Sequence, residues 1–237
     1  ACEHEARYIL DDFDKVVSDL KKGIRTVAIV APAIAASFPD NYLRINGWLQ
    51  SLGVEAFFDV SFGAELTVKS YLEHVQKNKP ECVIAQPCPA IVSYIQIYRP
   101  ELVKYLAPAD SPMLHTCKMI KEYYPEYRNH KQIVISPCIA KKREFAETGF
   151  ADYNMTMLNI SKYLDQNKIS LQSFKEIDYA NQPAERAVLF STPGGLLQTA
   201  IREVPEIVNM TRKIEGPAVV YEYLNHLAEQ ISKKQNP

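Results

Sequence analysis

The amino-acid sequence predicts an α/β fold with mostly parallel sheets, helices on both faces and two similar lobes. Short apolar runs rich in β-branched residues alternate along the chain with longer amphipathic runs, the pattern of strands connected by helices. Residues 26–30 form a continuous apolar run, which is typical of a central strand buried on both faces. Residues 84–88 and 133–138 each end at Pro-Cys and precede helix-compatible sequence, so the same unit occurs twice.

The first half of the chain alternates regularly between the two kinds of element. Apolar residues at helical spacing predict a helix over residues 8–22, which Gly23 ends. The segments that follow predict, in order, a strand over 26–30, a helix over 42–51, a strand over 54–60, a helix reaching about residue 77 and a strand over 82–85.

The second half continues the alternation with more interruptions. Pro100 opens a short helix, and Cys117 lies on the apolar face of the next one, which favours a core position for its thiol. The remaining predicted elements are a helix over 113–124, strands over 133–135 and 153–157, a helix over 158–166, an irregular segment over 170–186, a strand over 187–190, a helix ending at 203 and a helix over 219–231.

Composition and charge limit the class of protein. The chain has 237 residues, a net charge of −1 and a pI near 6.6, which does not favour a nucleic acid or a membrane surface as partner. Its five cysteines are an odd number, and the chain is large enough to fold without disulfide bonds, so we do not expect a disulfide framework. The sequence contains neither an apolar run near the ~20 residues of a membrane-spanning helix nor a signal peptide. We expect a cytoplasmic protein, and the start without Met and the polar tail fit a piece of a longer chain.

Cys88 and Cys138 are the candidate functional residues of the repeated unit. Each follows a strand-like run and precedes a helix, so each is predicted on a turn at the carboxyl end of a strand. Ligands bind at that end of an open α/β sheet, and a helix N-terminus stabilises a thiolate. The alternative is that both are small, buried apolar side chains, as free cysteines often are.

Six short motifs follow one another along the chain. They are residues 86–90 (Gln-Pro-Cys-Pro-Ala), 98–102 (Tyr-Arg-Pro-Glu-Leu), 111–112 (Ser-Pro), 136–144 (Ser-Pro-Cys-Ile-Ala-Lys-Lys-Arg-Glu), 152–153 (Asp-Tyr) and 190–195 (Phe-Ser-Thr-Pro-Gly-Gly). In this order they resemble the catalytic large subunit of iron-only (FeFe) hydrogenases, over roughly residues 24–205. The Pro-Cys-x-x-Lys-x-x-Glu run is the most specific of the six.

The resemblance implies a role for each matching position. Cys88 and Cys138 match thiolate ligands of a 4Fe-4S cluster, a soft-ligand site that suits iron. Lys141 matches the lysine that holds a cyanide of the attached diiron unit, and Glu144 belongs to the same loop. The turn Ala31, Pro32 and Ala33 matches one wall of the diiron pocket, and Phe190 with Ser191 matches the opposite wall.

Three departures from the family pattern bear on activity. The family has a proton-passing cysteine directly before the first ligand, whereas this chain has Pro87, which carries no titratable proton. Ser136 stands where the family commonly has Met, which predicts a more polar pocket. The family's last two cluster cysteines lie in a glycine-rich motif near its C-terminus, and this chain has no such motif. Two of the four thiolates are therefore expected here, so the isolated chain should bind metal poorly.

The resemblance also divides the chain. Residues 1–23 match the tail of a preceding ferredoxin-like module with its linking helix, and residues 24–237 match a hydrogenase-like core that is truncated at its C-terminus. Cys2 resembles the last cysteine of such a module, or is a terminal thiol without structure. We expect partners in the same longer chain: the ferredoxin-like module and sensory or output domains.

Several of these residues also have simpler explanations. Lys141, Lys142 and Glu144 fit an ordinary solvated helix start as well. His115 either faces the pocket or lies at the surface. Residues 191–195 either bind an anion at a helix N-terminus or form a tight connection.

Three functions follow from these observations. The preferred hypothesis is a redox or hydrogen sensor that keeps the fold and an iron-sulfur site. The alternative is part of an active FeFe hydrogenase that oxidises hydrogen or reduces protons, for which Pro87 removes the last proton donor. The third is a cofactor-free α/β ligand-binding domain, which lacks a phosphate-binding glycine motif.

Overall fold

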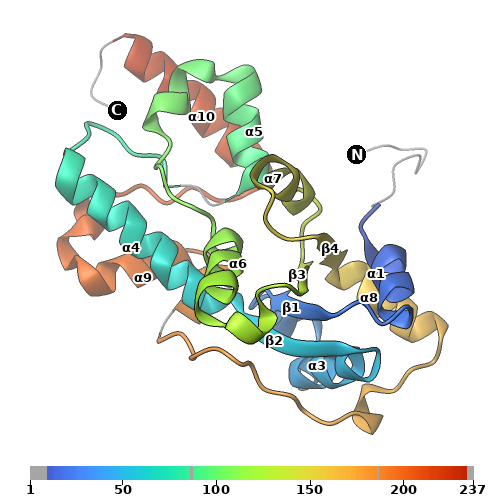
Figure 1. Cartoon of the computed structure of the whole chain (residues 1–237). Coiled ribbons are helices and arrows are strands. Elements are labelled where there is room, and N and C mark those ends of the chain that lie inside the picture. The colour runs from blue at the N-terminus through green and yellow to red at the C-terminus, as the bar shows by residue number, and fades with distance from the viewer. Residues whose placement is uncertain (1–9, 86–87, 186, 234–237) are drawn as a thin grey trace, which may run out of the picture.

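A four-stranded sheet of parallel strands forms the centre of the protein (Figure 1). The computed structural model describes residues 10–85, 88–185 and 187–233. The strands, in the order β2-β1-β3-β4 across the sheet, are β2 (Val54–Asp59), β1 (Thr26–Val30), β3 (Lys131–Ser136) and β4 (Tyr153–Thr156). The predicted α/β class with a parallel sheet is confirmed.

The strand register aligns the carboxyl ends of the four strands. Val30 of β1 pairs with Asp59 of β2 on one side and with Ile135 of β3 on the other. Ser136 of β3 pairs in turn with Thr156 of β4. The loops that leave these strands therefore start from one edge of the sheet, the edge at which open α/β sheets bind ligands.

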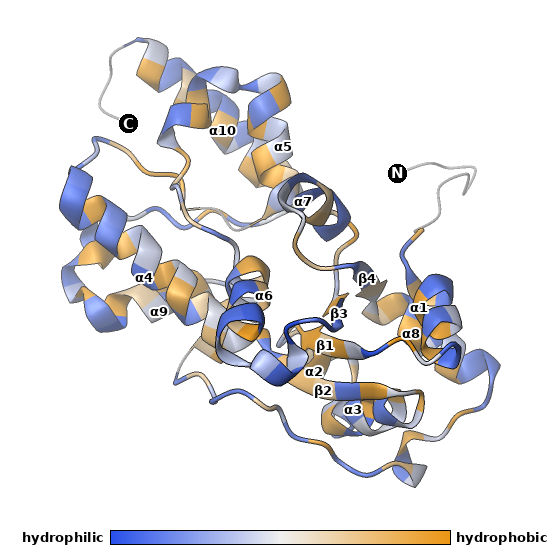
Figure 2. Cartoon of the chain, viewed as in Figure 1, coloured by the Kyte–Doolittle hydropathy of each residue, from blue (hydrophilic) through white to orange (hydrophobic). Residues whose placement is uncertain are grey.

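Helices cover both faces of this sheet. Phe13, Trp48 and Tyr163 pack ring against ring, which joins α1 (Phe13–Lys21), α3 (Tyr42–Ser51) and α8 (Met157–Gln166) on one face. The other face is covered by α4 (Val60–Asn78) and α6 (Pro112–Tyr123), and there Phe58 of β2 meets Tyr124 just after α6 (Figure 1). β1 is buried at all five positions because both faces are covered, and Figure 2 shows apolar residues along this strand.

The described α-helices are α1 (Phe13–Lys21), α2 (Ile34–Ser37), α3 (Tyr42–Ser51), α4 (Val60–Asn78), α5 (Pro89–Tyr98), α6 (Pro112–Tyr123), α7 (Lys141–Thr148), α8 (Met157–Gln166), α9 (Gly195–Glu203) and α10 (Pro217–Ser232). Short 3-10 helices are η1 (Pro100–Tyr105), η2 (Pro125–Tyr127), η3 (Leu171–Ser173), η4 (Ala187–Ser191) and η5 (Pro205–Met210). Within the described ranges, no helix is both long and apolar enough to cross a membrane.

Helices pack without a second sheet in the remainder of the described chain. α5, η1 and α10 share a small core that contains Ile95, Leu102 and Leu224, and Figure 1 shows α5 and α10 together, away from the sheet. A further small core joins α4 to α9 through Val68 and Ala200.

Two of the predicted strands, residues 82–85 and 187–190, were wrong. Residues 82–85 form only an isolated bridge, between Ile84 and Leu106, and residues 187–190 lie in the 3-10 helix η4. A strand needs partners for its main-chain groups along its length, and Ile84 finds them at one point only. The described residues therefore contain one sheet and do not show the second sheet that two similar lobes would require.

The observed starts of two helices differ from the predicted ones. α4 starts directly after β2, since the Asp59 carboxylate accepts hydrogen bonds from the Ser61 amide and hydroxyl, both at 2.9 Å. α1 begins at Phe13 rather than residue 8, and residues 8 and 9 lie outside the described part.

The amino ends of three strands are joined through Glu55. Arg25 donates to its carboxylate at 3.0 and 3.1 Å, and His130 lies 2.9 Å away. The Arg25 hydrogen bonds, followed by that of His130, lower the pKa of Glu55 to about 2. Because this carboxyl pKa is lowered on folding, its stabilisation is complete above the unfolded value and is lost as the pH falls through the folded value.

We expect Glu55→Gln to lower the free energy of unfolding by about 1 kcal/mol at pH 7, a value discounted because the side chain is partly exposed. The difference from wild type should shrink between about pH 4.5 and 2. Denaturant unfolding across this range is the measurement, with the exposed Glu73→Gln as control. A difference that stays constant with pH would contradict the assignment.

Close contact between α4 and α6 depends on Gly63. A methyl group at this position would overlap the Pro112 carbonyl and the Thr116 hydroxyl. Gly63→Ala should therefore cost about 1–3 kcal/mol of stability, as overpacking does. Lys69→Ala, at an exposed position of the same helix, should change stability by less than about 0.5 kcal/mol. Equal thermal unfolding of the two variants would refute this account.

Candidate functional site

Cys138 lies in the short loop between β3 and α7. The residue is exposed, and its sulfur accepts a hydrogen bond from the Ala140 amide at 3.4 Å. α7 begins three residues later at Lys141, so the thiol lies next to a helix N-terminus. The predicted turn at the carboxyl end of a strand is confirmed for this cysteine.

Cys88 occupies the N-cap position of α5. Its backbone is extended (φ −93°, ψ 114°), and Pro89 takes the first helical position, which suits proline because no amide is needed there. The residue is only partly buried, and the described residues just before it, 82–85, form an isolated bridge instead of the predicted strand. Gln86 and Pro87 lie outside the described residues. Neither candidate cysteine is therefore a buried core residue, in contrast to Cys117.

The two helices that follow the cysteines are held together by Arg143. From α7 its guanidinium donates to the Ser93 hydroxyl at 2.6 Å and to the Gln96 side-chain oxygen Oε1 at 3.2 Å, both on α5. It also pairs with Glu147 at 2.6 Å. This contact fixes the spacing between the helices that start at Cys88 and after Cys138.

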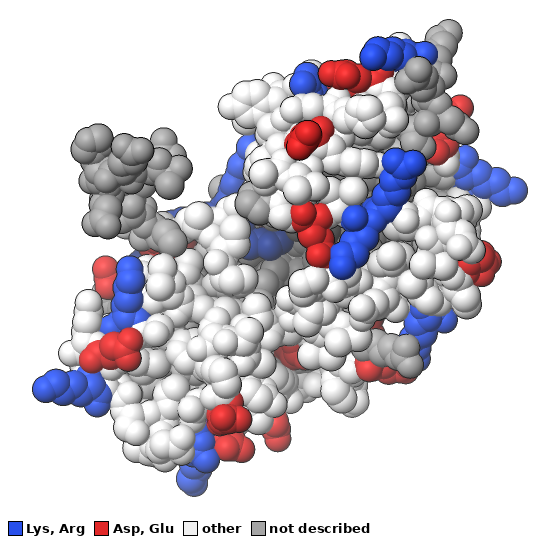
Figure 3. All heavy atoms as spheres, turned by 180° about the vertical axis from the view of Figure 1, so that it is seen from behind, with Lys and Arg blue, Asp and Glu red and all other residues white. Residues whose placement is uncertain are grey.

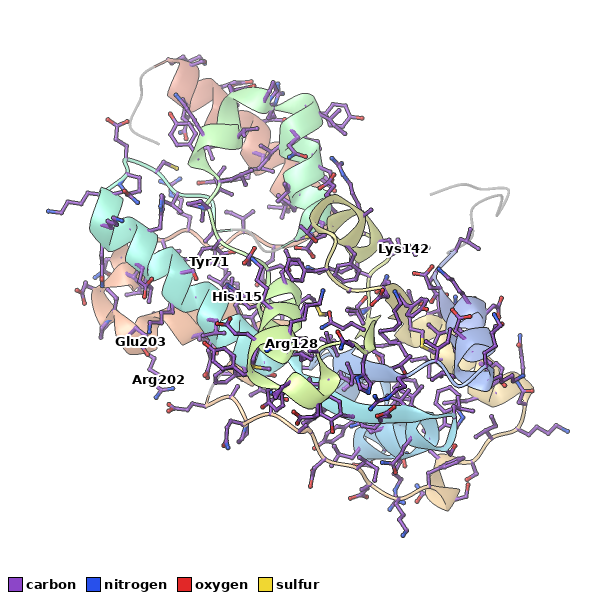
Figure 4. The ribbon with its side chains drawn as sticks, in the orientation of Figure 1. Tyr71, His115, Arg128, Lys142, Arg202 and Glu203 are labelled. Atoms are coloured by element: carbon purple, nitrogen blue, oxygen red, sulfur yellow. The ribbon has the colours of Figure 1, made fainter. Side chains whose placement is uncertain are left out.

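A cleft of about 550 Å³ lies between α5, α7 and the start of α6. Glu144 and Glu147 line it from α7, and Leu114 and His115 line it from α6. The Nε2 atom of His115 is enclosed and has no hydrogen-bond partner among the described residues, and burial lowers the pKa of this ring. His115 is therefore a cleft residue and not an exposed one; Figure 4 shows it on α6.

Lys141 and Glu144 form an ion pair with a separation of 2.8 Å. Their side chains are 12% and 14% exposed, so they are not a solvated helix start. Such a shielded pair requires hydrogen bonding to offset the loss of water. The structure thus places the predicted lysine and glutamate together, directly after the Cys138 loop.

The Ala31, Pro32 and Ala33 turn lies beside the Cys138 loop. The Ala31 amide donates to the Ile135 carbonyl at 2.9 Å, which extends the pairing of β1 and β3 beyond Val30. The chain leaves β1 toward β2 and leaves β3 toward β4, so this is the position at which the strand order reverses.

Phe190 and Ser191 belong to a different neighbourhood. Phe190 packs against the core formed by Val68, Leu72 and Ala200, between α4 and α9. Ser191 is exposed and donates its hydroxyl to the Val188 carbonyl at 3.2 Å. No described hydrogen bond links either residue to the two cysteine loops, so their place in a pocket wall stays a prediction.

Two side chains from adjacent strands hold the Cys138 loop, and the sequence analysis did not single out one of them, Asn154. Asn154 in β4 donates to the Cys138 carbonyl at 3.1 Å, and the Ser136 hydroxyl donates to Asn154 Oδ1 at 2.8 Å. Ser136 is buried and engaged in this network, so it does not simply make a pocket more polar. An asparagine inside the strand-like run Tyr153-Asn154-Met155 was the available signal, since a buried amide requires partners.

The described cysteines differ in their suitability as ligands of a 4Fe-4S cluster. Such a cluster takes four thiolates. Burial raises the pKa of Cys117 to about 12 and also raises that of Cys82, so neither favours the thiolate form. The described ranges contain no group of three or more His, Cys, Asp or Glu side chains able to hold a metal. Cys88 and Cys138 are the suitable thiols among them.

Charged side chains of both signs are mixed on the face shown in Figure 3.

Known proteins resemble this chain in sequence and fold. Iron hydrogenase 1 of Clostridium pasteurianum is 24% identical over 208 residues, which cover 76% of this chain and 36% of that protein. The cytosolic Fe-S cluster assembly factor NAR1 of Yarrowia lipolytica is 23% identical over 148 residues, 55% of this chain and 30% of that protein. The chain thus spans about a third of the length of these curated relatives.

The fold also resembles a solved structure of an FeFe hydrogenase. FeFe-hydrogenase HydA1 from Chlamydomonas reinhardtii superposes with a TM-score of 0.65 at 22% identity, over 83% of this chain and 58% of that one. Residues 24–236 also match the family model described as iron only hydrogenase large subunit, C-terminal domain. Because this match covers most of the sequence, the chain belongs to the family formed by the C-terminal domains of iron-only hydrogenase large subunits.

Proposed function

We propose that this chain is the iron-sulfur part of a redox or hydrogen sensor, a regulatory module within a longer cytoplasmic protein. The observation that carries the proposal is Pro87, directly before Cys88. Proton transfer at a metal centre needs a group that titrates within reach, and proline has none. Binding and electron transfer at an iron-sulfur cluster do not need this group.

The positions of Cys88 and Cys138 support iron-sulfur binding. Family membership implies iron-sulfur cofactors, and each of these thiols is close to the start of a helix. In this proposal they supply two ligands, and the remaining two come from elsewhere in the longer protein. A ferredoxin-like module before residue 24 and an output domain are the proposed partners.

A relative supports a role without hydrogen turnover. One similar protein is named a cytosolic Fe-S cluster assembly factor, so the fold also occurs in proteins whose names indicate no hydrogenase activity. The second candidate function is part of an active FeFe hydrogenase. The shielded Lys141–Glu144 pair favours it, because the family lysine at this position holds a cyanide of the diiron unit.

Iron binding should depend on two of the described cysteines. We expect the 237-residue chain, reconstituted anaerobically with iron, sulfide and excess dithiothreitol, to hold less than one cluster per chain. Cys88→Ser and Cys138→Ser should each remove most of the bound iron, whereas Cys82→Ser should not. Iron analysis with visible absorption measures the effect. Retention of the wild-type iron content by either of the first two variants would rule out the proposed ligands.

Hydrogen turnover should be limited by residue 87. In the full-length protein matured anaerobically with hydrogenase assembly factors, we expect hydrogen evolution at least about 100-fold below that of an active family member, the typical contribution of one acid-base group.

Pro87→Cys should raise this rate, whereas Pro87→Ser, which relieves the same backbone restriction, should not. Infrared bands of metal-bound CO and cyanide would establish that a diiron unit is present in all three proteins. Fast turnover by the unmodified protein would favour the hydrogenase alternative.

A further inference from the structure

The segment directly before α1 is bonded to the edge of the sheet. The Asp12 amide donates to the Asn154 carbonyl at 2.9 Å, and the Asp12 carboxylate accepts from the Asn154 amide at 2.9 Å. The neighbouring Asp11 carboxylate accepts from the amide and the hydroxyl of Thr156, both at 2.6 Å. Both acidic residues therefore bind the outer edge of β4, the last strand of the sheet.

Asn154 connects this edge to the cysteine loop. Its side chain is fully buried, with the amide group bonded to the Cys138 carbonyl and to the Ser136 hydroxyl. The Cys138 amide donates to Ser136 Oγ at 3.3 Å, so both main-chain groups of this cysteine are held. Burying the Asn154 side-chain amide without hydrogen-bond partners would cost free energy, so its buried position requires these bonds.

A second connection runs from Asp12 to α7. Lys142 donates to the Asp12 carboxylate at 2.8 Å, and Figure 4 shows Lys142 on α7. Lys142 is the neighbour of Lys141, so Asp12 contacts the helix that carries the Lys141–Glu144 pair. One carboxylate thus accepts bonds from β4 and from α7.

Asp12 does more than begin α1. It occupies the N-cap position, but its side chain makes no capping hydrogen bond. The first helical amide, of Phe13, donates to Asp11 instead, at 3.0 Å. The Asp12 carboxylate is directed at β4 and α7, which is not what helix capping requires.

We propose that Asp12 and Asn154 are positioning residues that couple the segment before α1 to the Cys138 loop. A displacement of that segment changes the bonds of Asn154 and Lys142, and with them the placement of Cys138. The inference deepens the proposed function, on which it rests for the role of Cys138 as a ligand. It gives a module attached before residue 10 a physical route to one ligand of the cluster.

Hydrogen exchange of the metal-free 237-residue chain tests the coupling. Asp12→Ala should speed exchange of the amides of residues 138–143 on the order of fivefold, the effect of losing about one net hydrogen bond. Asp14→Ala is the matched control, because Asp14 lies in the same helical turn but is exposed. It should leave those amides unchanged, and α5 should be unchanged in both variants.

The coupling should also operate in the opposite direction. Linkage between two sites is reciprocal, so Ser136→Ala should speed exchange at residues 12–16. Asp12→Asn keeps the shape of the side chain and provides a second test if Asp12→Ala does not fold. If Asp12 had a merely structural role, its replacement would speed exchange in α1 alone or in all segments equally. Either result would overturn the proposal.

No iron enters this experiment. Reciprocal exchange effects, together with iron binding that does not depend on Cys88 and Cys138, would refute the proposed ligands and keep the coupling. A chain that binds a cluster through Cys88 and Cys138 without exchange effects would refute the coupling and keep the proposed function.

Discussion

The parallel pairing of β1 with β3 is the constraint on which the site depends. Val30 and Ile135 lie opposite each other, and the Ala31 amide continues the ladder to the Ile135 carbonyl. This brings the Ala31–Pro32–Ala33 turn and the Cys138 loop to one edge of the sheet, where the strand order reverses. The pairing is buried on both faces, so it is shielded from competing water and the loops start from a rigid base.

The second cysteine depends on a different kind of support. Cys88 starts α5, whose core is shared with η1 and α10, and Arg143 connects this helix to α7. A sheet therefore fixes one thiol and helix packing fixes the other. Polar contacts between helices open more easily than a buried parallel ladder, so the two cysteine loops are held with different firmness.

The polar network around Cys138 distinguishes this chain from the family pattern. Ser136 replaces the common Met, and its hydroxyl is satisfied by Asn154 in the adjacent strand. The two residues are 18 positions apart, and their contact follows from the pairing of β3 with β4. Asn154 then joins Cys138 to Asp12, so the polar residue next to Cys138 is linked to the start of α1.

The sequence by itself determined β1, β2 and β3, most helices and the placement of both cysteines near helix starts, because periodicity and proline positions act locally. It also indicated the family through the motifs around Cys88 and Cys138. Only the tertiary structure decided that residues 82–85 and 187–190 are not strands, since a strand exists only where another strand meets its main-chain groups. It also decided that Lys141 and Glu144 are shielded and that Asn154 holds the cysteine loop, because burial and hydrogen-bond partners arise from segments far apart in the chain.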